Sequence, residues 1–291
     1  MSIKNIKKEE FNETFLEKLL EISDCPKSLF YSGNFPDNNK KTKYIAIVGS
    51  RQHSNYAKES LEKIMSELKG QNIVIISGLA LGIDTLAHKY AIKNNLKTIT
   101  VPGSGLGEKN LYPRSNLELT KEILDNNGLL LSEFKENFKA TPWSFPQRNR
   151  IMAGISDMVL IVEAKEKSGT LITARLALDY NKDLVVIPNS IFSEYSKGSN
   201  RLMKQGAPPI FCGNDILEIL GLTENKPKQK TLNLDDFSEN EQKILKILEE
   251  PMNKQELQEK LNLNITQLNT ELSILELKDV IKESLGKYRK I

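Results

Sequence analysis

The stretch YIAIVGSR (44–51) joins a short run of β-branched and apolar residues directly to a glycine and two polar residues. Similar runs recur between residues 73 and 188, as IVIIS (73–77), KTITV (97–101), GLLL (128–131), MVLIV (158–162) and LVVIP (184–188). Continuous apolar runs of this length are typical of parallel strands that are buried on both faces. The alternative, buried helix segments, is disfavoured because the runs are short and rich in Val and Ile. The sequence therefore predicts an α/β fold with a doubly wound, mostly parallel sheet.

Composition divides the chain into four parts. Residues 1–43 are expected to form a short helical lead-in, because FNETFLEKLLEIS (11–23) has apolar residues at helical spacing, and residues 44–222 carry the sheet. Residues 223–237 are expected to be a linker, since they lack apolar periodicity and contain Pro, Lys and Asn. Residues 238–291 show three helical patterns followed by a hairpin around Gly286, which indicates a small C-terminal winged-helix domain.

Charge distinguishes the C-terminal domain from the rest of the chain. The formal net charge is +3, yet residues 223–291 contain 12 Lys and Arg against 13 Asp and Glu. The third helical pattern (264–278), in the place of a recognition helix, has no Lys or Arg before Lys278. Phosphate contacts dominate affinity for DNA, so this helix is poorly equipped to read DNA alone. We expect this domain to contact a protein or to play a weak accessory role.

Composition also excludes several classes of protein. No apolar run approaches the ~20 residues of a membrane-spanning helix. The first residues, MSIKNIKKEEF, contain no apolar signal segment, so we expect a soluble protein of the cytoplasm with no membrane partner. Cys25 and Cys212 are far apart and the only histidines are His53 and His88, so we expect no disulfide, metal site or cofactor.

The first strand ends in Gly49, Ser50 and Arg51. A dinucleotide-binding fold would need G-x-G-x-x-G here, and the sequence lacks it. Polar residues at the carboxyl end of a parallel strand face the crevice in which such folds bind ligands. Arg51 is therefore a candidate phosphate ligand, with a surface arginine beside a tight turn as the alternative.

Two further strand ends carry polar residues or glycine. Asp84 and His88 lie four residues apart on a predicted helix, where they could form an acid/base pair or a helix cap with a structural hydrogen bond. A glycine loop (103–107) follows the third strand, and Arg114 comes shortly after it. Arg114 would add a second cation at the same edge of the sheet.

The stretch WSFPQRNR (143–150) places two aromatic residues beside two arginines around a proline. This composition is typical of single-strand binding sites, because rings stack on bases and guanidinium groups hold phosphates. Trp143 could equally be packed, and one arginine could brace the fold. We expect at least one of Arg148 and Arg150 to contact a ligand.

The residues Ser168, Gly169 and Thr170 follow the strand at 158–162 and open a helical pattern. Such a helix start offers backbone N–H groups, hydroxyls and the positive end of the helix dipole to an anion. It is a candidate phosphate site without a Walker lysine, or simply a capped helix.

Seven motifs, in this order, resemble the DNA processing protein A family (DprA/Smf), and the resemblance extends from about Cys25 to Leu222. The motifs are GSR (49–51), SGLALGIDTLAH (77–88), YPRSN (112–116), LLLSE (129–133), FPQRNRIMAGIS (145–156), SGTLITARLA (168–177) and KGSNRLMKQGA (197–207).

The resemblance implies an extended Rossmann-like domain that binds single-stranded DNA without cutting it, so the protein would not be an enzyme. It implies a homodimer that protects incoming DNA in natural transformation. It also implies that the protein loads the RecA recombinase where single-strand-binding protein would block it. Arg51, Arg148 and Arg150 would hold phosphates and Phe145 would stack on a base. The full set of expected nucleic-acid contacts is Gly49, Ser50, Arg51, Arg114, Phe145, Arg148, Asn149, Arg150, Ser168, Gly169 and Thr170.

The sequence departs from the family pattern at two positions. Leu81 stands where members commonly have Arg, and Asn189 stands where the usual residue is Gly. Dimerisation in the family uses the segment that corresponds to 200–211. Its expected interface residues are Asn200, Leu202, Met203, Ile210 and Phe211.

A hypothesis of a different class remains open. Rossmann-like folds also occur in small-nucleotide-binding and nucleotide-hydrolysing enzymes, in which an acid at the same edge serves as a base. Glu133, Glu163 or Asp84 would have that role here. A weaker third hypothesis makes the winged helix a sequence-specific operator reader.

Overall fold

The computed structural model describes residues 2–36, 41–222, 237–261, 263–278, 280–284 and 286–290. Contacts within the chain divide it into two compact units, Met1–Glu224 and Asn225–Ile291, each with its own apolar core. Of the expected linker, only Phe237 lies within the described residues. No helix in these ranges is both long enough and apolar enough to cross a membrane.

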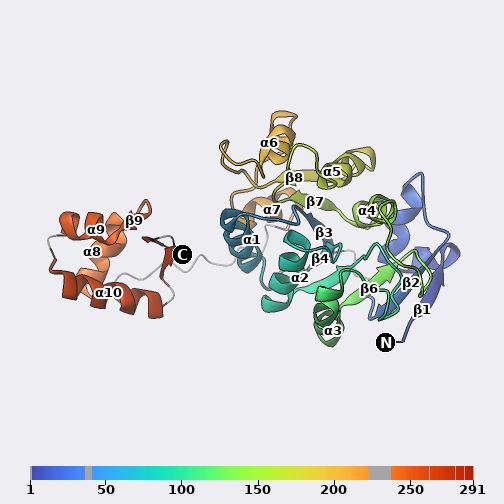
Figure 1. Ribbon diagram of the computed structural model, residues 1–291, viewed down its shortest axis with the longest axis horizontal. Helices are drawn as coiled ribbons and strands as arrows, with labels where there is room; N and C mark the ends of the chain where they lie inside the picture. The colour runs from blue at the N-terminus through green and yellow to red at the C-terminus, as the bar shows by residue number, and fades with distance from the viewer. Residues whose placement is uncertain are drawn as a thin grey trace. The chain divides into compact units, whose positions relative to one another are not determined.

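The first unit is built on an eight-stranded sheet with the order β1-β2-β6-β5-β4-β3-β7-β8 (Figure 1). The six strands that the sequence predicts are all present and run parallel to one another, which confirms the α/β fold with a doubly wound, mostly parallel sheet. They are β3 (Lys43–Val48), β4 (Ile73–Ser77), β5 (Lys97–Thr100), β6 (Leu129–Ser132), β7 (Met158–Ile161) and β8 (Asp183–Val186). The strand order reverses at β3, which lies between β4 and β7, so the switch point of the fold is at β3 and β7.

Helices cover both faces of this sheet, as the alternation of side chains along β3 requires (Figure 1). Ile45 and Ile47 pack in one core with α1 (Asn55–Glu67), α2 (Ile83–Lys93) and α7 (Gly213–Ile219). Ala46 and Val48 pack in the other core with α4 (Ser144–Ile155), α5 (Thr170–Asp179) and α6 (Lys197–Lys204). Leu119 and Ile123 of α3 (Leu117–Asp125) belong to a smaller cluster beside β6.

The N-terminal segment differs from the expected helical lead-in. Residues 8–21 form two 3-10 helices, η1 (Lys8–Glu13) and η2 (Phe15–Glu21), because Thr14 is extended between them and its hydroxyl caps the second. Two antiparallel strands, β1 (Lys4–Lys7) and β2 (Ser28–Gly33), extend the sheet beyond β6. Residues 2–36 are thus part of the same sheet and core as the rest of the first unit.

The second unit has the predicted order of three helices followed by a hairpin. It contains α8 (Glu239–Ile247), β9 (Met252–Asn253), α9 (Lys254–Leu261), α10 (Ile265–Leu277), β10 (Ile281–Ser284) and β11 (Lys287–Lys290). The short strand β9, which the sequence patterns do not indicate, pairs with β11 and completes a three-stranded sheet. The Ser238 hydroxyl oxygen caps α8 by accepting a hydrogen bond from the Glu241 amide, and the Glu241 carboxylate accepts one from the Ser238 amide.

Candidate nucleic-acid interface

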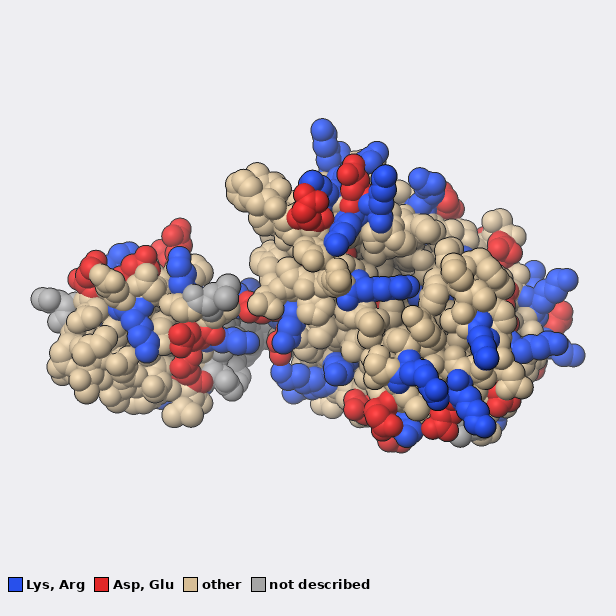
Figure 2. All heavy atoms as spheres, viewed as in Figure 1, with Lys and Arg blue, Asp and Glu red and all other residues tan. Residues whose placement is uncertain are grey.

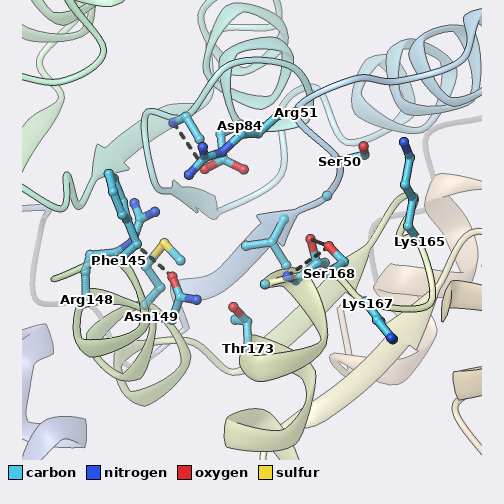
Figure 3. Close-up of a pocket in the computed structure, with 16 residues that line it drawn as sticks. Ser50, Arg51, Asp84, Phe145, Arg148, Asn149, Lys165, Lys167, Ser168 and Thr173 are labelled. Atoms are coloured by element: carbon cyan, nitrogen blue, oxygen red, sulfur yellow. Dashed lines mark hydrogen bonds between the residues drawn. The ribbon is translucent and has the colours of Figure 1, made fainter. Parts of the chain in front are cut away.

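A pocket of about 290 Å³ opens at the switch point, beyond the carboxyl ends of β3 and β7. Four segments that are distant in sequence supply its walls: the loop after β3, the start of α2, the first turns of α4, and the loop that leads into α5. Figure 3 shows Phe145, Arg148 and Asn149 on one side of the pocket and Lys165 and Lys167 on the opposite side, with Ser168 between them. Parallel α/β sheets bind ligands at this position.

The pocket is bordered mainly by positive charge. Its lining includes Arg51, Arg148, Lys165 and Lys167 against one acid, Asp84. Arg51, Lys165 and Lys167 are exposed, so they can reach a ligand from solvent. On the face in Figure 2, Lys and Arg side chains gather over α5 and α6 together with a few acidic ones. An anionic ligand therefore fits this pocket better than a neutral or cationic one.

Phe145 and Arg51 form the aromatic part of the site. The Arg51 guanidinium lies over the Phe145 ring, 5.3 Å from its centroid, within cation–π range. Gly103 makes room for the ring, because a Cβ at that position would lie 2.7 Å from a Phe145 ring carbon. The glycine loop after β5 thus supports the aromatic wall of the pocket.

The start of α5 is partly capped by its own hydroxyls. Ser168 Oγ accepts a hydrogen bond from the Thr170 amide at 3.2 Å and donates one to Thr170 Oγ1 at 3.0 Å. The amides of Leu171 and Ile172 bond to the carbonyls of Ser168 and Gly169. The two interpretations of this motif are therefore compatible, since the capped turn also lines the pocket and Gly169 is exposed there.

Arg148 is a buried part of the pocket wall. It is 5% exposed, and its Nη1 donates hydrogen bonds to the carbonyls of Gly78 and Val101, while Nε donates to Asn149 Oδ1 at 3.0 Å. Gly78 is required there because a Cβ would overlap the guanidinium. Burial lowers the pKa of Arg148 to about 10, with nearby Asp84 opposing that shift, so the group stays charged at neutral pH. Arg148 joins the ends of β4 and β5 to α4.

Asp84 and His88 have separate partners. The Asp84 carboxylate accepts hydrogen bonds from the amides of Gly78 (3.1 Å) and Ala80 (3.3 Å), and burial raises its pKa. His88 Nδ1 lies 2.7 Å from Thr98 Oγ1, and burial together with Arg148 lowers the pKa of His88 to about 3. Both contacts are structural hydrogen bonds, but Asp84 does not cap α2, because the N-cap is Gly82 and Asp84 bonds the loop before the helix. Of the two residues, only Asp84 lines the pocket.

Two of the expected arginines do not line the pocket. Arg150 is buried, its Nη2 lies 2.5 Å from Glu133 Oε1, and its Nη1 donates to the Asp24 carbonyl, so it ties α4 to the N-terminal segment and to the end of β6. Arg114 is exposed on the short 3-10 helix η3 (Arg114–Asn116). The remaining expected contacts that the pocket brings together are Gly49, Ser50, Arg51, Phe145, Arg148, Asn149, Ser168, Gly169 and Thr170.

Lys165 and Lys167 are pocket residues that the expected set does not contain. Their sequence position could have identified them as candidate ligand contacts. They directly precede the Ser168-Gly169-Thr170 turn, where a cation lies beside any anion bound at the start of α5.

Only one of the five expected dimer residues presents a largely exposed side chain. Ile210 is fully buried and Leu202 is 9% exposed, since both belong to the cores of the first unit. Asn200 donates to the Asn189 carbonyl at 3.1 Å, and Met203 packs against a core. Phe211 is 68% exposed and follows a segment that bridges to β8 at the edge of the sheet.

The fold and this pocket together define a class: a Rossmann-like α/β protein with a cation-bordered pocket and an aromatic wall at the switch point. The chain belongs to the family of DNA recombination-mediator protein A, whose model matches residues 6–221. The DNA processing protein DprA of Streptococcus pneumoniae is 41% identical over 199 residues, which are 68% of this chain and 68% of that protein. DprA of Bacillus subtilis is 40% identical over 202 residues, covering 69% of this chain and 67% of that protein.

Solved structures agree with this assignment. The X-ray structure of DprA from Streptococcus pneumoniae superimposes with a TM-score of 0.68 at 37% identity, covering 75% of this chain and 74% of that one. A structure of DNA processing protein A from Helicobacter pylori gives a TM-score of 0.64 at 31% identity and covers 76% of this chain and 96% of that one. The latter is described as revealing a unique single-stranded DNA binding mode of that protein.

Proposed function

We propose that this protein binds single-stranded DNA in the pocket at β3 and β7. The observation that carries the proposal is the arrangement of exposed Arg51, Lys165 and Lys167 around a pocket whose wall contains the Phe145 ring. Cations that follow a backbone and a ring that stacks on a base are the two requirements of single-strand binding. The Helicobacter pylori relative, whose structure concerns single-stranded DNA binding, supports the same conclusion.

Fluorescence anisotropy of a labelled dT oligonucleotide tests this proposal, with duplex DNA as competitor. Three exposed cations predict that log affinity falls with log salt with a slope of about −2, from ~0.7 per phosphate contact. Arg51→Ala should weaken binding about tenfold or more, because it removes a charged contact and the cation over Phe145. Lys69→Ala is the control: it removes one exposed charge just beyond α1, at a residue that does not line the pocket. Equal affinities of the two variants would contradict the assignment.

For the bound strand we propose the role of a recombination mediator that protects it in transformation and loads RecA onto it in the presence of single-strand-binding protein. Membership of the family supports this role. The test is the rate of RecA filament formation on DNA already covered by single-strand-binding protein. The wild type should accelerate it and Arg51→Ala should not. If Arg51→Ala accelerates filament formation as much as the wild type does, RecA loading does not depend on DNA binding in this pocket.

We also propose that the protein forms a homodimer through the edge beyond β8, with Phe211 at the contact. This proposed interface is smaller than the one expected from the sequence, because Ile210 and Leu202 are buried in the cores of the first unit and cannot contact a partner. Sedimentation of the wild type and of Phe211→Asp measures the state of association. A monomeric variant with an unchanged circular dichroism spectrum is expected, and a dimeric one would move the interface elsewhere.

The proposed function is not enzymatic. The carboxylates that a nucleotide hydrolase would use already have partners. Glu133 is paired with Arg150, and fully buried Glu163 accepts from Ser54 Oγ (2.9 Å) and Asn189 Nδ2 (3.0 Å). Asp84 remains the acid of the pocket, and it accepts two backbone N–H groups. Turnover of a nucleoside triphosphate that is lost in Asp84→Asn would favour the enzymatic alternative.

A further inference from the structure

Tyr112 presents an exposed aromatic ring next to the pocket without lining it. Its side chain is 47% exposed, and its ring centroid lies 5.8 Å from that of Phe145. The Arg51 guanidinium lies over the same Phe145 ring, so three flat groups follow one another in the order Arg51, Phe145 and Tyr112. The aromatic surface that begins in the pocket therefore continues outside it.

The backbone around Tyr112 is firmly anchored. Leu111 and Pro113 on either side are buried, and Leu111 belongs to an apolar cluster with Leu79. Asn116 Nδ2 donates to the Leu79 carbonyl and to Thr85 Oγ1, both at 2.8 Å. The exposure of Tyr112 is thus imposed by buried neighbours on both sides. A ring held in this way loses little conformational entropy when it stacks on a ligand.

The sequence places a cation that does not line the pocket two residues after Tyr112. This cation, Arg114, is exposed on η3. A nucleotide carries one base and one phosphate. An aromatic ring that can stack on a base and an arginine that can bind a phosphate, both on one short anchored segment, therefore suit a single nucleotide of a DNA strand.

We propose that Tyr112 forms a second base-stacking position, which takes an unpaired nucleobase next to the one stacked on Phe145. This inference rests on the proposed single-stranded DNA function and extends its site by one nucleotide outside the pocket. The Tyr112 and Phe145 ring planes are inclined by 56°, so bases stacked on both rings are inclined to one another. The strand accordingly turns as it leaves the pocket.

Anisotropy titration of a dT oligonucleotide with the 291-residue wild type, Tyr112→Ser and Tyr112→Phe tests the proposal. Loss of one stacked base weakens binding by about five- to a hundredfold, so Tyr112→Ser should lie in that range. Tyr112→Phe should stay within about twofold of the wild type, because stacking requires the ring and not the hydroxyl. The salt dependence should be the same in all three proteins, since no charge changes.

Photocrosslinking of the wild type to an oligonucleotide that contains 5-iodouracil gives a readout that needs no variant. Peptides that contain Tyr112 and Phe145 should both carry the crosslink. A crosslink confined to Phe145, or wild-type affinity in Tyr112→Ser, overturns the second stacking position while leaving the pocket intact. Absence of Arg51-dependent binding in the wild type overturns the proposed function and this inference together.

Discussion

The pocket of the first unit lies where parallel α/β sheets bind ligands, and helix α10 of the second unit lies where winged-helix domains contact DNA, yet their surfaces differ. The pocket is bordered by exposed Arg51, Lys165 and Lys167. Helix α10 exposes Thr266, Gln267 and Thr270 but contains no Lys or Arg. Because phosphate neutralisation supplies most of the affinity for DNA, only the pocket is equipped for it. Position in a fold does not by itself assign a function.

The exposed surface of α10 suits a protein partner better than DNA. Leu277 is 86% exposed and Ile265 is 47% exposed, whereas the cation that directly follows the helix, Lys278, is paired with buried Glu241 at 2.7 Å. Exposed apolar side chains with a paired cation suit a protein contact better than a phosphate backbone. The expectation of a protein contact for the winged helix thus remains our prediction for this domain.

The largest effect should come from removing the charge of the pocket. The double variant Lys165→Ala/Lys167→Ala should lower affinity for single-stranded DNA about a hundredfold and make the salt slope shallower by about 1.4, at ~0.7 per contact. Anisotropy at two salt concentrations measures both. The matched control is Lys63→Ala/Lys69→Ala, which removes two exposed lysines of α1 and the turn that follows it. An unchanged salt slope in the pocket variant would contradict the claim that Lys165 and Lys167 contact DNA phosphates.

The two units should also differ in their response to pH. His88 lies behind the pocket, whereas the second unit contains no histidine. Burial lowers the pKa of His88 to about 3 in the folded state, so between pH 6.5 and pH 3 the unfolded chain binds a proton that the folded chain does not. Stability is therefore lost as the pH falls, by about 2 kcal/mol between pH 6.5 and pH 5. Asp84, whose pKa burial raises, acts in the opposite direction.

Comparison with His88→Asn separates these two contributions, because Asp84 is present in both proteins. The difference in the free energy of unfolding between wild type and variant should shrink by about 2 kcal/mol from pH 7 to pH 5. Trp143 is the only tryptophan of the chain, so its fluorescence during urea unfolding reports on the first unit. A difference that stays constant with pH would show that His88 is charged or solvated in the folded state.

Charge added to α10 should make the two surfaces more alike. Thr266 and Thr270 are exposed one turn apart on α10, and replacing both by Lys should raise affinity for duplex DNA about tenfold, with a steeper salt dependence. Thr266→Gln/Thr270→Gln is the uncharged control. No gain would mean that shape, and not only charge, keeps this helix from DNA.

The smallest effect should follow from removing the second unit altogether. Without residues 225–291 the first unit keeps its own cores and its pocket, so affinity for single-stranded DNA should change by no more than about twofold. Anisotropy with the same oligonucleotide measures this. A larger loss would show that the second unit contributes directly to DNA binding.

The strands and the edge of the sheet that holds the site were predictable from the sequence. The Val- and Ile-rich runs are too short for buried helices and have the length of buried strands. The polar residues that follow these strands, such as Arg51 and Ser168, lie at the carboxyl edge of the parallel sheet and therefore come together. The N-terminal strands escaped prediction because β2 (SLFYSG) lacks a continuous apolar run and pairs with β6, about a hundred residues away.

The roles of the two arginines in FPQRNR show what only the tertiary structure decided. Arg148 and Arg150 have the same chemistry and lie two residues apart on α4, so they point to different sides of the helix. Gly78, Val101 and Asn149 surround the first in the pocket wall, and Glu133 and Asp24 hold the second away from it. The amino-acid sequence by itself determined the fold class and the edge of the sheet that holds the pocket, because both follow from local apolar patterns. The tertiary structure decided which cations reach a ligand, because that depends on partners brought together from distant parts of the chain.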